Sequence, residues 1–210
     1  MNSERSAFAA RLAAAEAMVE QARVSGEKRA LADALRELGN VQRRPPELRD
    51  AADRAYSEAA ELYRELKRPL DRAWVIRHIG IDHEYADRLI DAERAYDEAL
   101  DLYRENSQSD DLDYANAVRY AAVVKDRLGK RGDAVTLWEE AVRRYESVGI
   151  VEGVAEGTAH LTLFALKEGD LQLAKVWFAR AEAASSRSND PETHKFIDEV
   201  RQRLIGAGIG

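Results

Sequence analysis

A stripe of small and aromatic residues recurs four times along this chain. In each copy an alanine, an aromatic residue and a second alanine follow one another at steps of four and three residues. The copies are 40 or 42 residues apart, at Ala52, Tyr56, Ala59 and Tyr63, at Ala92, Tyr96, Ala99 and Tyr103, at Ala134, Trp138, Ala141 and Tyr145, and at Ala174, Phe178, Ala181 and Ser185. A period of this length is the signature of a repeat protein, so it constrains the fold more than any other feature.

The spacing of the stripe indicates helices that pack closely on their neighbours. Steps of four, three and four residues keep all members on one face of an α-helix. Alanine allows a second helix to come close, and the aromatic ring between the alanines fills the remaining space. A second apolar helix precedes each stripe, marked by Leu35 and Gly39, Ile76 and Gly80, Val118 and Ala122, and Leu161 and Thr162. Each repeat is therefore predicted to be two antiparallel helices, an A helix and a B helix.

Prolines and glycines fall between these predicted helices, which supports an all-α fold with about ten helices and no strand. We expect a single solenoid domain over residues 1–210, because stacked repeats share one continuous core. A half-repeat helix and a capping helix are predicted to close its ends. The predicted parts are an N-terminal helix at 4–24, repeats at 28–68, 70–106, 112–148 and 151–187, a capping helix at 191–205 and a flexible tail at 206–210.

The repeats resemble the tetratricopeptide repeat (TPR) family, and the segment from Ile76 to Ala99, IRHIGIDHEYADRLIDAERAYDEA, carries the resemblance best. The likeness covers about residues 28–188. The period of 40–42 residues is similar to the longer-helix variety in kinesin light chains and in some bacterial regulators. The resemblance implies an α-α superhelix whose A helices line a concave groove that binds peptides.

Composition narrows the function classes. The chain has no cysteine, which excludes disulfides, thiol catalysis and cysteine-ligated metals. Its net charge of −7 argues against nucleic acid as a partner. There is no apolar run long enough to span a membrane and no signal peptide, so we expect a cytoplasmic protein without membrane contact. The histidine and acidic motifs fit no metal site, cofactor or catalytic group, and an enzyme is not expected.

The groove positions of the predicted A helices supply the candidate binding residues. Arg36, Arg77 and Arg119 occupy the same offset in three successive A helices. Arginine binds carboxylates through two parallel hydrogen bonds, so this column predicts a groove for an acidic peptide. A solvated face without a ligand is the alternative. The full set of candidate groove residues is Arg36, Asn40, Arg43, Trp74, Arg77, His78, Asn116, Arg119 and Tyr120, and the fourth repeat offers Glu156 and His160 at the same offsets.

Some TPR proteins hold the carboxylate end of a chaperone tail in a five-residue clamp. Arg36 and Asn40 stand at two of the clamp positions, with arginine in place of lysine. His78, Asn116 and Tyr120 stand at the other three, where the clamp requires asparagine, lysine and arginine. With two of five roles met, a chaperone adaptor is not predicted.

Three glycines, Gly149, Gly153 and Gly157, recur every four residues at the start of the fourth A helix. They suit either a hinge or close approach of another chain. A helix that starts only after Gly153 explains them equally well.

We therefore expect a non-enzymatic interaction module that holds a protein or peptide segment in its groove, with the arginines pointing to an acidic one. One alternative is a homodimer or larger assembly through the terminal helices. The other is a regulatory domain that senses a peptide.

Overall fold

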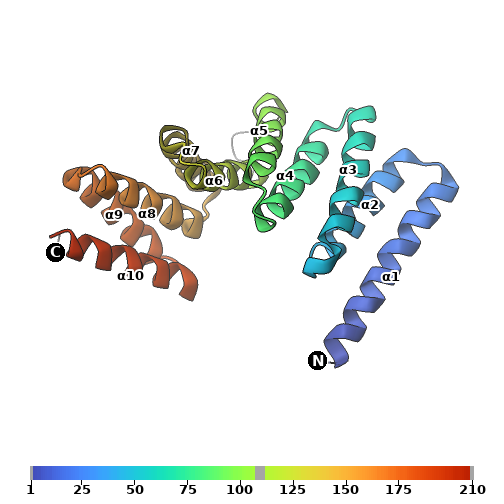
Figure 1. Cartoon of the computed structure of the whole chain (residues 1–210), viewed down its shortest axis with the longest axis horizontal. Helices are drawn as coiled ribbons and strands as arrows, with labels where there is room; N and C mark the ends of the chain where they lie inside the picture. Colours follow the sequence, from blue (N-terminus) through green and yellow to red (C-terminus); the bar gives the residue numbers. More distant parts are fainter. Residues whose placement is uncertain (1, 107–111, 209–210) are drawn as a thin grey trace. The chain divides into compact units, whose positions relative to one another are not determined.

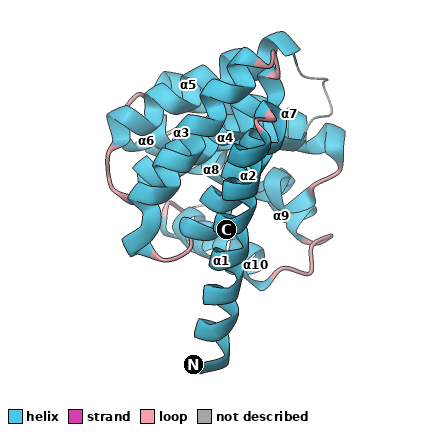
Figure 2. Cartoon of the chain, turned by 90° about the vertical axis from the view of Figure 1, so that its right-hand side faces the viewer, coloured by secondary structure: helices cyan, strands magenta, loops and turns pink. Residues whose placement is uncertain are grey.

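The computed structural model describes residues 2–106 and 112–208 (Figure 1). Within these residues the chain forms ten α-helices and one short 3-10 helix and has no strand, which confirms the all-α prediction (Figure 2). The helices are α1 (Asn2–Ser25), α2 (Lys28–Gln42), η1 (Pro46–Leu48), α3 (Arg49–Glu65), α4 (Pro69–Tyr85), α5 (Leu89–Asn106), α6 (Leu112–Arg127), α7 (Arg131–Val148), α8 (Val151–Lys167), α9 (Leu171–Ser185) and α10 (Pro191–Gly206).

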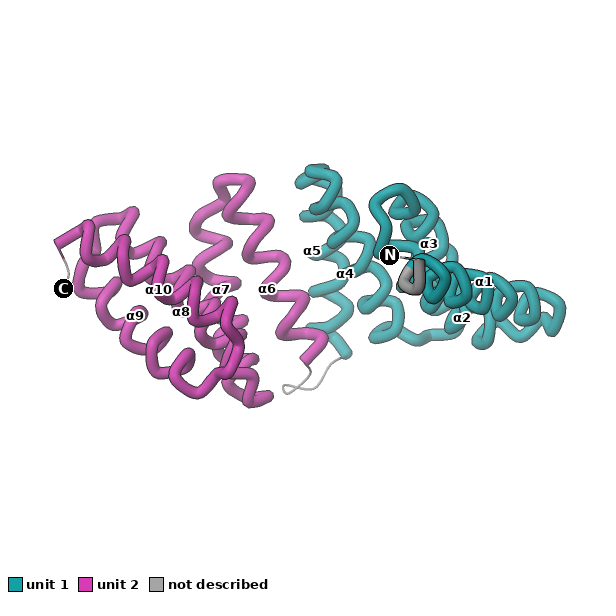
Figure 3. The backbone as a smooth tube through the Cα atoms, turned by 90° about the horizontal axis from the view of Figure 1, so that it is seen from below, with its two compact units in different colours: residues 1–107 teal, residues 108–210 magenta. Residues whose placement is uncertain are grey.

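The chain divides into two compact units, Met1–Ser107 and Gln108–Gly210, called unit 1 and unit 2 here (Figure 3). In unit 1 each helix from α1 to α5 packs on the next one along the chain. In unit 2 the helices from α6 to α9 do the same, and α10 packs on both α8 and α9. Consecutive packing of helix pairs is the arrangement that the repeats predict. The proposal that one domain spans residues 1–210 stays a prediction.

The four aromatic residues at the centre of the stripes are buried in α3, α5, α7 and α9. Two of them lie directly against a glycine of the preceding A helix. A Cβ atom added to Gly39 would stand 2.6 Å from Cε1 of Tyr56, and one added to Gly80 would stand 2.6 Å from Cε1 of Tyr96. The ring thus fills the volume that glycine leaves open, as the small-and-large pattern predicts.

Two of the three glycines at the start of the fourth repeat, Gly153 and Gly157, allow close packing within the chain. Gly149 ends α7 in the left-handed conformation, with φ of 74°. Helix α8 already begins at Val151, so the alternative explanation, a helix that starts only after Gly153, is wrong. A Cβ on Gly153 would stand 2.4 Å from Cγ of Tyr145, and one on Gly157 would stand 2.6 Å from Cγ2 of Val142. The neighbour that approaches these glycines is therefore α7.

The last helix differs slightly from its predicted bounds. The carboxylate of Asp190 accepts a hydrogen bond from the backbone N–H of Thr193, and Pro191 follows at the first helical position. At the other end Gly206 still belongs to α10, although the tail was predicted to begin there, because the backbone N–H of Ala207 still bonds to the carbonyl of Arg203. Residues 209–210 of that tail lie outside the described residues.

None of the helices in the described part of the chain combines the length and the apolar character needed to cross a bilayer.

Candidate functional site

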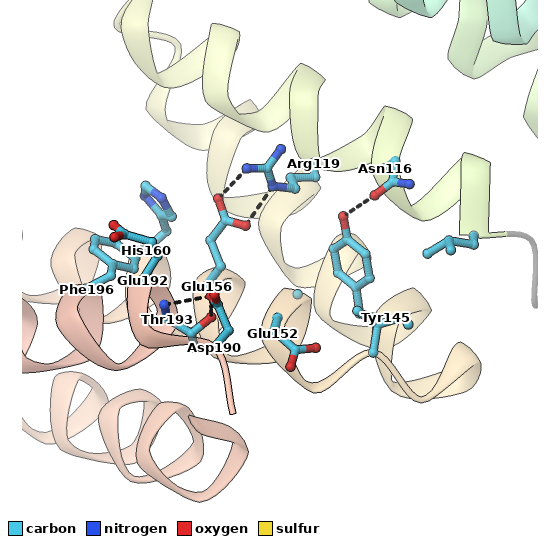
Figure 4. A pocket seen from close by; sticks show the side chains of 13 residues that line it. Asn116, Arg119, Tyr145, Glu152, Glu156, His160, Asp190, Glu192, Thr193 and Phe196 are labelled. Carbon is cyan, nitrogen blue, oxygen red and sulfur yellow. Dashed lines mark hydrogen bonds and ion pairs between the residues drawn. The ribbon is translucent and has the colours of Figure 1, made fainter. Parts of the chain in front are cut away.

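Unit 2 contains a cleft of about 660 Å³ (Figure 4). Helix α6 contributes Asn116 and Arg119, and α8 contributes Glu156 and His160. The remaining lining residues come from the ends of α6, α7 and α8, from the first two turns of α10 and from the residues just before α8 and α10. They are Leu112, Tyr145, Ile150, Glu152, Gly153, Asp190, Glu192, Thr193 and Phe196. The cleft therefore lies on the A helices of two repeats and is closed by the terminal helix.

A bidentate ion pair crosses the cleft between α6 and α8. Arg119 donates from Nε to Oε2 of Glu156 at 2.6 Å and from Nη2 to Oε1 at 2.8 Å. Burial lowers the pKa of the guanidinium, but the hydrogen bonds and the charge of Glu156 outweigh it, so the pKa of Arg119 is raised. Arg119 also lies over the ring of Tyr120, at 5.0 Å from its centroid. Glu156 thus already occupies the two donors with which Arg119 would grip an acidic ligand.

Aromatic rings form one wall of the cleft. His160 stacks on Trp138, with ring centroids 4.3 Å apart and planes 9° from parallel. Its other neighbour is Phe196 of α10, whose ring centroid lies 5.3 Å away. Burial lowers the pKa of His160, so the imidazole is neutral at pH 7 and offers an apolar ring rather than a charge.

Carboxylates outnumber cations in the cleft. Glu152, Glu156, Asp190 and Glu192 line it, with Arg119 as the only arginine or lysine among the lining residues. A hydrogen bond from Ser188 lowers the pKa of Glu152, and hydrogen bonds from Thr193 lower the pKa of Asp190. Both are therefore charged at neutral pH, and the cleft favours a positively charged group.

Tyr145 fixes the orientation of one predicted groove residue. Its hydroxyl donates to Oδ1 of Asn116 at 2.8 Å. The Nδ2 amide group of Asn116 has no hydrogen-bond partner within the described residues, so it can donate to a carbonyl group of a ligand.

In unit 1 the structure brings three predicted groove residues together around a fourth, Trp74. The guanidinium carbons of Arg36 and Arg77 lie 5.5 and 5.9 Å from the ring centroid of Trp74. His78 stacks on the same ring, with centroids 3.6 Å apart. Arg36 also pairs with Asp71, at 3.3 Å between Nη1 and Oδ1. Trp74 is half-buried, whereas Arg77 is only 5% exposed, so Arg36 and Trp74 form the accessible part of this cluster.

The other two predicted residues of unit 1 already have internal partners. Asn40 accepts a hydrogen bond from the hydroxyl of Tyr56 at 2.8 Å and donates to Glu37 at 3.3 Å. Arg43 pairs with the buried carboxylate of Asp82, at 3.2 Å from Nη2 to Oδ1. Arg119 belongs to unit 2, so a single column formed with Arg36 and Arg77 stays a prediction.

Sequence reasoning missed two contributions to the cleft. Three of the predicted groove arginines pair with a carboxylate that lies 35 to 39 residues later in the chain, as in Arg36–Asp71, Arg43–Asp82 and Arg119–Glu156. An acidic residue about one repeat after a groove arginine is a signal that could have revealed these pairs. The residues of α10 were assigned only to capping, and the pattern of the sequence does not show that their helix also packs on α8.

The buried His78 makes folding stability depend on pH. Burial, assisted by the charge of Arg77, lowers its pKa to about 3, although a hydrogen bond to the carbonyl of Trp74 opposes the shift. Below its ordinary pKa of about 6.5, the unfolded chain binds a proton that the folded chain does not. The contribution of His78 to the free energy of unfolding is therefore fully present above pH 6.5 and is lost as the pH falls toward 3. We expect His78→Gln to reduce the loss of unfolding free energy between pH 7.5 and pH 4.5, measured by urea denaturation.

The control for this prediction is His194→Gln, which removes an exposed histidine of α10. An unchanged pH dependence in the His78 variant would contradict the prediction.

Comparisons with known proteins bear on the fold. No family model matches the sequence, and none of the curated proteins matches it. Among solved structures the chain resembles BtubC (BKLC) from P. vanneervenii, at 20% identity and a TM-score of 0.75, with 93% of this chain and 84% of that chain covered. It also resembles the nearly identical TPR-like repeats of a putative kinesin light chain from Podospora anserina, at 11% identity and a TM-score of 0.59, with 85% of this chain and 97% of that chain covered. At these identities the likeness concerns the fold.

Proposed function

Since the chain has the TPR-like repeat fold that its sequence predicts, we propose that it is a non-enzymatic module that binds a segment of a partner protein. The cleft of unit 2 is the proposed binding site, and a peptide or helix with at least one basic side chain is the proposed ligand. The observation that carries the proposal is the set of four carboxylates around a single arginine in a cleft with an aromatic wall.

The lining of the cleft suits a peptide with both a charged and an apolar side chain. Glu152 and Glu192 supply negative charge for a lysine or arginine. The rings of His160 and Phe196 offer an apolar surface to a neighbouring side chain of the same ligand. The Nδ2 amide group of Asn116 can donate a hydrogen bond to a backbone carbonyl group of the ligand. Apolar anchors beside a few fixed polar groups are typical of binding sites.

The same lining argues for binding without catalysis. A histidine that acts as a general base needs a hydrogen bond to a nucleophile or to an orienting group. In the described part of the chain His160 makes ring contacts and no hydrogen bond, and burial lowers its pKa. Glu156 is held by Arg119 in a bidentate pair. These groups are suited to hold a ligand in place.

Site-specific cross-linking tests the proposal. The photoreactive residue benzoylphenylalanine would replace Phe196 in the cleft or, as a control, the exposed Val176 on α9. We expect a partner to be captured from position 196 and not from position 176, with the cross-linked peptide containing lysine or arginine. Adding Glu152→Lys and Glu192→Lys should abolish that capture, because the cleft then repels a basic side chain.

The matched control is Asp133→Lys with Glu168→Lys, which makes the same change in charge at exposed positions outside the cleft. It should leave the cross-link intact. Capture of the same proteins from positions 176 and 196, or capture that survives the charge reversal in the cleft, would show that the cleft is not the binding site.

Self-assembly is a second candidate, supported by apolar side chains on the first helix. Met18 and Val24 of α1 are 50% and 81% exposed. Light scattering at increasing protein concentration tests self-assembly. A protein that stays monomeric at high concentration would exclude it.

A further inference from the structure

A second cleft, of about 530 Å³, lies in unit 1 and is lined mainly by arginines. Arg11 comes from α1, Arg43 and Arg44 directly follow α2, and Arg49 begins α3. Tyr85, the last residue of α4, lines the same cleft. Glu37 is the only carboxylate among the lining residues, and it accepts a hydrogen bond from Asn40.

Within the described residues three of the four arginines form no ion pair, although the charge of Arg49 acts on Asp82, where it opposes the rise in pKa that burial causes. Arg43 is paired with Asp82. Arg11 and Arg44 are exposed, and within the described residues their guanidinium groups make no hydrogen bond or ion pair. Arg49 lies over the ring of Tyr85, at 4.5 Å from its centroid, and its Nε atom is buried without an acceptor. Elsewhere in unit 1, by contrast, Arg36 and Arg88 each face an aspartate.

The local backbone holds these arginines close together. Pro45 and Pro46 restrict the short connection between α2 and α3, where η1 forms a single turn. The N-terminus of α3 begins at Arg49, and the residue before it provides no side-chain cap. The positive end of the α3 dipole adds to the charge of the three guanidinium groups. Asp50 in the first turn of α3 and the C-terminal ends of α2 and α4, at Arg43 and Tyr85, oppose this contribution. Like charges that lie close together repel each other, and an anion bound in the cleft would offset this repulsion.

We propose that this arginine cleft binds a run of acidic side chains on a partner protein. The inference rests on the proposed function as an interaction module and assigns it a second site with the opposite preference in charge. Each unpaired arginine can grip a carboxylate through two hydrogen bonds, and Tyr85 holds the Arg49 guanidinium in place for such a contact. The acidic ligand that the sequence predicts can therefore bind to Arg11, Arg44 and Arg49. These residues line the same cleft as the predicted groove residues Asn40 and Arg43.

Fluorescence anisotropy with a fluorescein-labelled hexaglutamate peptide tests this proposal, and labelled hexaglutamine serves as the neutral control. We expect hexaglutamate to bind the full chain, with an affinity that falls as salt rises. The triple variant Arg11→Gln, Arg44→Gln and Arg49→Gln should weaken binding about tenfold or more, because three charge-assisted contacts are lost. Circular dichroism verifies that the variant is folded.

The matched variant is Arg54→Gln, Arg94→Gln and Arg104→Gln, which removes three exposed arginines of unit 1 outside the cleft. It should change the affinity by less than about twofold, since only long-range, screened charge is altered. The single change Arg49→Lys keeps the charge but removes the planar fork, and it should weaken binding as well. An equal loss in both triple variants, or no binding by the unaltered chain, would overturn the proposal.

Two further arms separate the possible outcomes. A labelled single-stranded oligonucleotide that binds more tightly than hexaglutamate through the same arginines would assign the cleft to nucleic acid, against the proposal. The charge reversals Glu152→Lys and Glu192→Lys in unit 2 should leave hexaglutamate binding in place. If hexaglutamate fails to bind while the cross-link at Phe196 persists, this inference fails and the proposed function stands. The reverse result would reject the cleft of unit 2 and keep the arginine cleft.

Discussion

Replacing Trp138 with alanine is expected to lower the free energy of unfolding of unit 2 by about 3–5 kcal/mol. The indole is fully buried in α7, between Ala134 and Ala141 of its own helix, and it supports His160 in the wall of the cleft. Its removal leaves a cavity that neighbouring helices can fill only in part. Urea denaturation followed by far-UV circular dichroism measures the effect without relying on tryptophan fluorescence.

Trp177→Ala is the matched control, because the same side chain is removed from a half-buried position on α9, where Arg180 lies over its ring. We expect it to cost much less than Trp138→Ala. Equal costs for the two variants would mean that the stripe residue is not a packing element, contrary to the argument from the repeats.

Gly80→Ala is expected to destabilise unit 1 by about 1–3 kcal/mol, although alanine is normally the better helix former. The added Cβ would stand 2.6 Å from Cε1 and 2.8 Å from Cδ1 of Tyr96, whose ring is fully buried. The ring cannot withdraw without displacing α5. Overpacking therefore exceeds the gain in helix propensity, and thermal and urea unfolding should both show the loss.

A glycine-to-alanine substitution at Gly132 should not lower the free energy of unfolding. Gly132 lies in the first turn of α7, and a Cβ there would meet no atom within 4 Å. Only the helix propensity remains, so Gly132→Ala should be neutral or stabilise by up to about 1 kcal/mol. A stabilising Gly80→Ala would contradict the inference that glycine is needed for close approach of the ring.

The two clefts give the protein surfaces of opposite charge within a chain whose net charge is −7. The carboxylates of unit 2 and the unpaired arginines of unit 1 partly cancel in that sum. Net charge alone therefore does not describe what either unit attracts. The charges that matter are those without an internal partner, because a paired arginine such as Arg119 must first release Glu156.

The helical repeats and the packing role of the aromatic stripe could be predicted from the sequence alone. Both follow from local rules, since side chains three and four residues apart share a helix face and only small residues allow close approach. Tyr56, Tyr96, Trp138 and Phe178 are buried on successive B helices, as these rules predict. Asn116 and Arg119, which the A-helix offsets assign to the groove, line one cleft together with Glu156 and His160. That this cleft binds a ligand stays a prediction.

Which charged side chains remain available to a ligand depends on how the helices pack, and the sequence pattern does not show it. The sequence assigns Arg36 and Arg119 to the groove column, yet both face a carboxylate of the next repeat, Asp71 and Glu156. Arg11 and Arg44, which no sequence pattern singles out, form no ion pair within the described residues. The physical reason is that an ion pair requires atoms to meet within a few ångströms, and the packing of one repeat on the next determines which of many acidic residues comes within that distance. The position of α10 against α8, which completes the cleft of unit 2, depends on packing in the same way.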